Sequence, residues 1–192
     1  MKKNWLFLLL VLLVVSCKAN PEVENGSKTK DSIREEITQI DDSLKFYFEE
    51  IMDNKRSELP ISTIDKAIEL HHEFYAKFPE DEYSAECLNK IHQLHLQKKE
   101  YGKSVQICDT LFVHYPNYEK INEVYFSAAT TYDYLLSDTV NAKKYYQVLI
   151  ASPSASKSVK KEIEMRLPYL GKSPEEMAEE INVEVEQVLK GK

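Results

Sequence analysis

The chain has 192 residues, 43% of them apolar and 30% charged, which is enough to bury a continuous core in one globular domain with tails. Its formal net charge of −7 makes it a poor nucleic-acid binder. Only four glycines occur, which argues against a turn-rich β fold, a phosphate loop or a dinucleotide-binding turn, and apolar residues recur at helical spacing, so we expect an all-α fold.

The first 16 residues differ in character from the rest of the chain. Lys2 and Lys3 precede an unbroken apolar run over residues 5–15, which is short for a membrane-spanning helix of about 20 residues and typical of a secretory signal peptide. The end of this region, LVVSC at 13–17, resembles the lipobox of bacterial lipoproteins. That resemblance implies that Cys17 is diacylated, becomes the new N-terminus and is then acylated on its amine. The alternative is an ordinary signal peptide with a coincidental cysteine.

Export and lipidation divide the N-terminal region into two parts. Residues 1–16 are expected to be the lipoprotein signal peptide, and residues 17–31, which contain almost nothing to bury, a flexible tether from lipidated Cys17. Cleavage removes two lysines and no acids, so the mature chain carries a net charge of −9. Lys18 follows the cysteine where enteric lipoproteins retained at the inner membrane have aspartate, and this resemblance implies the outer membrane.

Residues 32–60 are expected to form a helix followed by a loop. The helix carries an apolar stripe with heptad spacing, made of Ile33, Ile37, Ile40, Leu44, Tyr47 and Ile51. Two interpretations remain open. The stripe packs on the next helices as a cap or missing first half of a repeat, which we favour because the end of a helical array needs covering, or it is the seam of a coiled-coil oligomer. The favoured interpretation predicts a monomer.

Residues 61–171 contain a repeat, since Pro79, Pro116 and Pro153 each follow the previous proline by 37 residues. Apolar residues at helical spacing stand upstream of each proline, and these stripes align when shifted by one period: Ile68, His71, Phe74, Tyr75 and Phe78, then Val105, Cys108, Leu111, Phe112 and Tyr115, then Ala142, Tyr145, Val148 and Leu149. A second stripe follows the first two prolines: Ala85, Leu88, Ile91 and His95, then Val124, Tyr125, Ala128 and Tyr132. We therefore predict about three antiparallel helix hairpins.

This pattern resembles the tetratricopeptide repeat. The segments that carry the resemblance run from Asp65 to Asp81, from Tyr101 to Asn117 and from Asn141 to Pro153. It implies an α-solenoid, and the long joint after Pro79 is similar to that of envelope proteins such as the lipoprotein subunit of the β-barrel assembly machinery and the Tol-Pal cell-division coordinator. The chain departs from the family pattern at His92 and Ala129, positions where these repeats usually have glycine.

The last segment, residues 172–192, is expected to be a helix that caps the array. Ser173 is a candidate N-cap, Pro174 stands in the first turn, and Glu176 is placed like the acid of a capping box. One apolar face follows, made of Met177, Ile181, Val185 and Val188.

No motif for catalysis or cofactor binding is present, so we assign no catalytic residue, no metal ligand and no cofactor, and we expect the protein not to be an enzyme. The alternative is a metal-dependent enzyme that uses His92 and His95, which share a helix face, with help from the preceding helix. Cys87 and Cys108 either form a disulfide in an oxidising compartment or are two small buried residues, and we favour burial.

Several tyrosines are candidates for a binding surface. Tyr118, Tyr125 and Tyr132 are expected to line a groove that binds an extended segment of another protein through flat aromatic rings. The expected function is therefore a lipid-anchored, non-catalytic interaction scaffold of the bacterial envelope, with a neutral or basic protein segment as its partner. The alternative is a coiled-coil coordinator of the Tol-Pal type.

Overall fold

The computed structural model describes residues 28–190, and every regular element in this range is a helix. The predicted all-α class is therefore confirmed. The elements are α1 (Lys30–Met52), α2 (Ile61–Lys77), α3 (Tyr83–Gln97), α4 (Tyr101–His114), α5 (Ile121–Thr130), the π-helix η1 (Thr131–Leu135), α6 (Thr139–Ala151), α7 (Lys157–Arg166), the 3-10 turn η2 (Leu167–Tyr169) and α8 (Pro174–Lys190).

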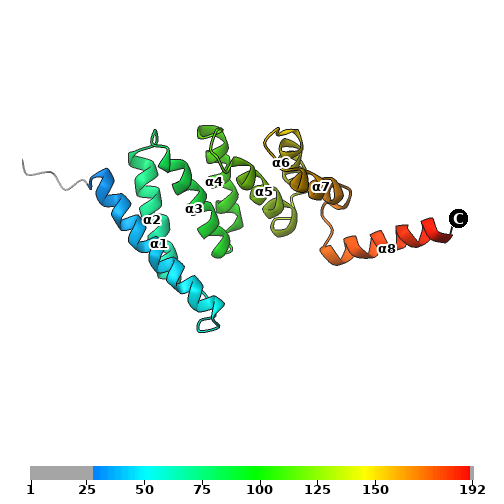
Figure 1. The fold of residues 1–192 in the computed structure, drawn as a ribbon, viewed down its shortest axis with the longest axis horizontal. Helices are drawn as coiled ribbons and strands as arrows, with labels where there is room; N and C mark the ends of the chain where they lie inside the picture. The colour runs from blue at the N-terminus through cyan, green and yellow to red at the C-terminus, as the bar shows by residue number, and fades with distance from the viewer. Residues whose placement is uncertain (1–27, 191–192) are drawn as a thin grey trace, which may run out of the picture.

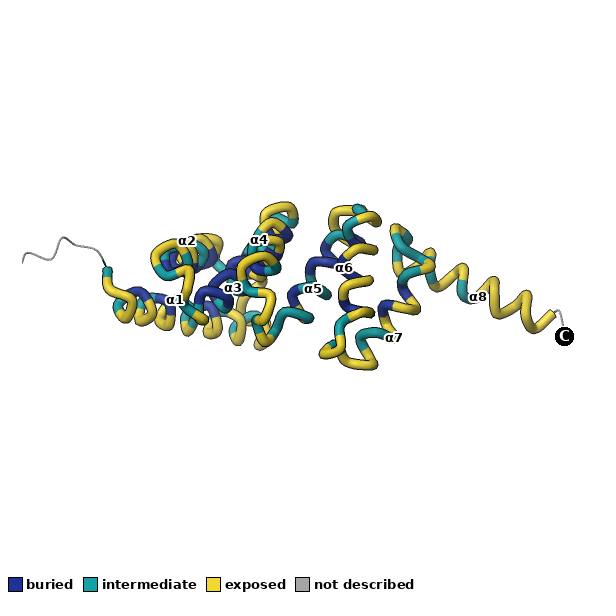
Figure 2. Tube along the Cα trace, turned by 90° about the horizontal axis from the view of Figure 1, so that it is seen from above, coloured by how far each residue is buried: buried dark blue, intermediate teal, exposed yellow. Residues whose placement is uncertain are grey.

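The helices from α1 to α7 stand in a row, and each of them packs mainly on the helices that precede and follow it in the chain (Figure 1). Viewed from above, α1 and α3 lie on one side of this row, and α2 and α4 lie on the other (Figure 2). The core is consequently a continuous strip between the two sides. The C-terminal helix α8 extends beyond the end of the row (Figure 1).

Two kinds of turn alternate along the chain. The turns from α1 to α2, from α3 to α4 and from η1 to α6 each contain a residue with positive φ, namely Asn54 at 56°, Lys99 at 60° and Ser137 at 53°. In the first two turns the next N–H closes the helix end, from Lys55 to the Glu50 carbonyl at 2.8 Å and from Glu100 to the His95 carbonyl at 2.9 Å. This is the Schellman closure, which satisfies carbonyls that have no partner at a helix end.

The second kind of turn precedes the periodic prolines. Phe78 and Tyr115, which end α2 and α4, have the same backbone angles, φ −131° and ψ 56°, and each stands directly before a proline. Ser152, at the third position, differs with φ −67° and ψ 124°. The 37-residue period of the sequence thus corresponds to a repeated backbone conformation at its first two positions, and the third turn departs from it.

The π-helix η1 accommodates one extra residue. Lys99 and Ser137 occupy equivalent turns but stand 38 residues apart, whereas the prolines keep their spacing of 37. A π turn is the usual way in which an α-helix absorbs one inserted residue. The insertion brings Asp133, which is only 3% exposed, into the interior.

Three residues of the apolar stripe of α1, Ile33, Ile37 and Leu44, are buried within the chain. Ile33 and Ile37 pack with Phe74 of α2 and Cys87 of α3, and Leu44 belongs to the neighbouring cluster of α2 and α3 residues. This arrangement agrees with the favoured interpretation, in which the helix packs on the array. The first half of the stripe is therefore not free to form the seam of a coiled coil.

Both cysteines in the described range are free and buried, so the favoured interpretation of Cys87 and Cys108 is confirmed. They belong to different core clusters, since Cys87 packs near α1 and Cys108 lies in the central cluster with Leu111 and Tyr145. Burial raises the pKa of the Cys87 thiol to about 12. Cys87 acts as a small apolar residue, whereas the Cys108 Sγ lies 3.1 Å from Nδ1 of His92.

His92, one of the positions at which the chain departs from the repeat pattern, is buried. Its side chain is 1% exposed, Nδ1 lies 2.7 Å from the Ser104 hydroxyl, and Nε2 lies 2.8 Å from the Ser127 hydroxyl. A neutral imidazole has one donor and one acceptor nitrogen, which suits two hydroxyl partners. Ser104 is small and fully buried, and it leaves room for the ring where α3 and α4 cross.

A buried ion pair joins η1 to the end of α7. Arg166 donates from Nε and Nη2 to the two oxygens of Asp133 at 2.7 and 2.8 Å, and it also donates to the Lys172 carbonyl at 2.7 Å. Gly171 N–H and the Tyr146 hydroxyl donate to the same carboxylate at 3.3 and 3.4 Å. Five hydrogen bonds thus connect η1, α6, α7 and the linker to α8.

The expected cap at the C-terminus is not observed. The helix itself is confirmed, with Ser173 and Glu176 forming the predicted capping box: the Ser173 N–H donates to Glu176 at 2.7 Å and the Glu176 N–H to the Ser173 hydroxyl at 3.2 Å. However, no residue of α8 is buried. Met177 contacts Arg166 of α7, and the helix extends away from α7 without covering it (Figure 2).

We expect His92 to make stability depend on pH. Desolvation lowers the pKa of His92 to about 4 from a usual value of 6.5, so below pH 6.5 the unfolded chain binds a proton that the folded chain does not. The free energy of unfolding should therefore fall by about 2 kcal/mol between pH 6.5 and pH 5 from this group alone. Urea unfolding at both pH values measures it. In the His92→Gln variant, the free energy of unfolding should no longer fall by this amount between the two pH values. An equal fall in the wild type and the variant would contradict a neutral, buried His92.

Candidate binding grooves

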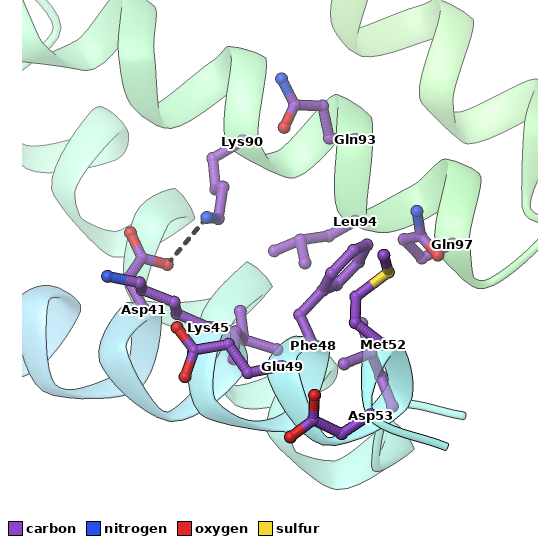
Figure 3. A pocket seen from close by; sticks show the side chains of 12 residues that line it. Asp41, Lys45, Phe48, Glu49, Met52, Asp53, Lys90, Gln93, Leu94 and Gln97 are labelled. Atoms are coloured by element: carbon purple, nitrogen blue, oxygen red, sulfur yellow. Dashed lines mark ion pairs between the residues drawn. The ribbon is translucent and has the colours of Figure 1, made fainter. Parts of the chain in front are cut away.

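Three grooves run between successive helices of the set α1, α3, α5 and α7. The first, here called the α1/α3 groove, has a volume of about 450 Å³ and is shown in Figure 3. Phe48 and Met52 of α1 and Leu94 of α3 come together in it. Phe48 is 50% exposed and Met52 is 73% exposed, so this apolar surface is open to a ligand.

An ion pair lies at one end of the α1/α3 groove. Asp41 Oδ1 lies 3.3 Å from Lys90 Nζ and 3.3 Å from Nε2 of the buried His71 (Figure 3 shows the lysine contact). Burial on its own raises the pKa of Asp41, but His71 and Lys90 outweigh this effect and the pKa is lowered. Glu49 and Asp53 add negative charge on the same side and Lys45 adds positive charge. The groove is therefore apolar with a mixed, charged rim.

The second groove, the α3/α5 groove, has a volume of about 460 Å³ and lies between the end of α3 and the junction of α5 with η1. Gln97 lines both this groove and the first one. Tyr134 and Leu135, which are 45% and 47% exposed, supply its apolar surface. The first two grooves therefore share a boundary residue.

The third groove, the α5/α7 groove, has a volume of about 370 Å³. Thr130 and Tyr134 line both it and the α3/α5 groove, and Met165 of α7 and Met177 of α8 complete its apolar surface. The guanidinium of Arg166 lies 4.4 Å from the centroid of the Tyr134 ring, a cation–π contact that holds the ring in place. The three grooves thus form one track along the row of helices.

Two of the three tyrosines that we expected in a groove lie elsewhere. The ring of Tyr125 stacks on Phe112 with centroids 3.8 Å apart and planes 9° apart, and Tyr132 stacks on Tyr145 at 5.7 Å. Neither of them lines any of the three grooves. They fill the space between α4, α5, η1 and α6, so the structure gives them a packing role.

Tyr118, the third candidate, lies at the turn between α4 and α5. Its hydroxyl donates to Glu86 and accepts a hydrogen bond from the Asn89 amide at 3.2 Å. The side chain lines a separate cavity of about 820 Å³ between the α2–α3 turn and the α4–α5 turn. Desolvation and the contact with Glu86 raise the pKa of Tyr118. The three tyrosines therefore do not share one surface.

The histidines of the metal alternative are engaged in other contacts. His92 is enclosed by serine hydroxyls, and His95 Nδ1 lies 2.7 Å from Glu100, which lowers the pKa of Glu100 to about 2 together with Lys103. Within residues 28–190, no three His, Cys, Asp or Glu side chains are grouped so that they could hold a metal ion. The predicted lipidation site, Cys17, lies outside the described residues.

The sequence carries one signal for the α1/α3 groove. Phe48 and Met52 are spaced four residues apart, as neighbours on one helix face, yet neither belongs to the heptad stripe of α1. Surplus apolar residues off the buried stripe indicate a second apolar face. Tyr134 of the other two grooves stands in no apolar stripe of the sequence, and its position depends on η1.

Comparison of the chain with protein-family models, curated proteins and solved structures found no match. Among the helices of residues 28–190, none combines the length and the hydropathy needed to cross a bilayer.

We expect Tyr125→Ala to destabilise the fold, because the substitution removes a half-buried ring that stacks on Phe112. The free energy of unfolding should fall by about 2 kcal/mol, measured by urea denaturation. Val113→Ala is the control: Val113 lies on α4 but is 73% exposed, and its loss should cost no more than about 0.5 kcal/mol. An unchanged stability of Tyr125→Ala would show that the ring is a surface residue.

Proposed function

We propose that this chain is a lipid-anchored, non-catalytic scaffold of the bacterial envelope that binds a segment of another protein along its helix row. The observation that carries the proposal is the linked track of three grooves, with Phe48, Met52 and Tyr134 exposed in it. Open apolar side chains bordered by polar and charged groups are typical of surfaces that bind proteins.

The repeat supports a tetratricopeptide-like solenoid as the framework of this scaffold. Its helices alternate between two turn types, and the first two period-defining turns, at Phe78 and Tyr115, have the same backbone conformation. In such arrays each unit buries its apolar face only against neighbouring units, and the result is an extended surface suited to a helix or an extended peptide.

The chemistry of the α1/α3 groove favours a neutral or basic partner. The α1/α3 groove has three carboxylates, on Asp41, Glu49 and Asp53, and two lysines, one of which pairs with Asp41. The mature chain expected after cleavage carries a net charge of −9. Complementary charge raises the association rate and the specificity, while apolar anchors supply most of the affinity.

Anchoring is the second part of the proposal and rests on the sequence. The charged start, the apolar run and LVVSC at 13–17 support a lipid on Cys17. Several acyl chains on one cysteine, each contributing about 0.8 kcal/mol per buried CH₂, are sufficient for stable attachment. Lys18 after the cysteine favours the outer membrane by resemblance to enteric lipoproteins. The scaffold would thus be held close to a membrane surface.

We expect Phe48→Ser to weaken binding of the partner, because Phe48 supplies an aromatic anchor in the α1/α3 groove. Loss of a central anchor costs about 2 kcal/mol, roughly thirty-fold in affinity. In-cell crosslinking followed by quantitative mass spectrometry should recover the wild-type partner set at a much lower yield from the variant.

The matched control is Phe46→Ser. Phe46 lies two residues away on the same helix and is 55% exposed, close to the 50% of Phe48, but it lines none of the three grooves. Binding by the track requires that Phe46→Ser retain the partners and Phe48→Ser lose them. The same partner yield from both variants would refute the groove assignment.

We expect Cys17→Ala to abolish lipidation. Metabolic labelling with a fatty acid should label the wild-type chain and leave Cys17→Ala unlabelled, and the variant should accumulate as uncleaved precursor or in the soluble fraction. Incorporation of label into Cys17→Ala would show that the lipid is attached elsewhere, and it would not affect the test of the groove.

A further inference from the structure

The C-terminal helix α8 carries an apolar stripe that nothing in residues 28–190 covers along most of its length. With about 100° between successive residues, the stripe occupies an arc of about 120°, which is the width of a face that normally packs on another element. Its members are Met177, Ile181, Val185, Val188 and Leu189. Val185, Val188 and Leu189 are 51%, 62% and 68% exposed.

The linker to α8 directs this helix away from the array. Gly171 has φ 81°, and a Cβ there would come within 2.9 Å of Thr139 Cγ2, so only glycine fits this close turn. The Gly171 N–H and the Lys172 carbonyl are both bound to the buried Asp133–Arg166 pair. Lys172 also pairs with Glu180, and the Tyr169 hydroxyl donates to Glu184 at 3.2 Å. The direction of α8 is therefore held by contacts that reach from the linker as far as Glu184.

The charge of α8 distinguishes among possible occupants of the stripe. The helix contains six glutamates and one lysine. Two copies of α8 would bring like charges together, and an anionic bilayer would repel a helix whose polar face is acidic. A basic surface attracts it. Charge complementarity thus favours a partner with an apolar face bordered by lysine or arginine.

The stripe also continues an apolar surface of the array. Met177 begins the stripe and at the same time lines the α5/α7 groove beside Met165 and Tyr134, and its sulfur lies 3.8 Å from Arg166 Nη1. A helix seated on Ile181, Val185 and Val188 would meet this groove without a break. The apolar surface available to one segment is therefore longer than α8 alone provides.

We propose that α8 is a docking arm for a basic amphipathic helix of another protein, which packs its apolar face on Val185 and Val188 while its cations pair with the flanking glutamates. This site adjoins the α5/α7 groove and so extends the proposed track, while its test at Val185 does not involve the α1/α3 groove or Phe48. The fixed linker pre-organises the arm, so a partner need not pay the cost of ordering it.

The test uses the purified full-length chain and a synthetic helical peptide with leucine along one face and lysine on both flanks. The critical variant is Val185→Ser and the matched control is Val183→Ser. Val183 is 54% exposed, as open as Val185 at 51%, but two residues along a helix place it about 160° away on the acidic face. Circular dichroism verifies that both variants keep the same helicity.

We expect Val185→Ser to weaken peptide binding about tenfold and Val183→Ser less than twofold, measured by fluorescence anisotropy. Binding should also weaken as salt is raised, and a peptide with glutamate in place of lysine should not bind. Equal effects of the two substitutions, or equal binding of the acidic peptide, overturn the proposal. A wild-type dimer in light scattering that Val185→Ser dissociates also overturns it, because a second copy would then cover the stripe.

Discussion

The apolar faces of α1 to α7 are covered by the helices that stand beside them in the chain, and this nearest-neighbour packing governs the rest of the structure. Ile33 and Ile37 of α1 are buried on α2 and α3, while Leu88, Leu111 and Tyr146 belong to one cluster that extends from α3 to α7. Stability in such an arrangement accumulates from one interface to the next. The helix at each end of the row therefore has a neighbour on one side only, and its outer apolar surface has to be covered in another way.

The two ends of the row differ: a helix packs on the array at the N-terminal end, and a helix leaves it at the C-terminal end. At the N-terminal end, α1 covers α2 and α3 with its heptad stripe, and its surplus apolar residues Phe48 and Met52 form a groove. At the other end, the Asp133–Arg166 pair secures α7, and α8 departs from the array. A buried pair of this kind is weak evidence for net stability, but removing one partner costs about 3–5 kcal/mol because the other charge is left uncompensated. It therefore specifies one arrangement of the linker.

Aromatic residues are divided between the two sides of the row. On the side of α4 and α6, Phe112, Tyr125, Tyr132 and Tyr145 stack on one another and fill the interface. On the side of α1, α3, α5 and α7, Phe48 and Tyr134 stand open in the grooves. The rings of the first group are covered by one another. The rings of Phe48 and Tyr134 stay exposed and can contact a partner.

The sequence by itself determined the all-α class, the helices on either side of Pro79 and Pro116, and the capping box of Ser173 and Glu176, because each depends on residues close together in the chain. Only the tertiary structure decided which apolar faces remain open. Tyr125 stacks on Phe112 of α4, whereas Tyr134, within the π-helix η1, stands open in a groove. The Asp133–Arg166 contact spans 33 residues, and periodicity carries no information about pairs so far apart. For the same reason, the amphipathic pattern of α8 predicted a helix with an apolar face but not the direction in which its linker holds it.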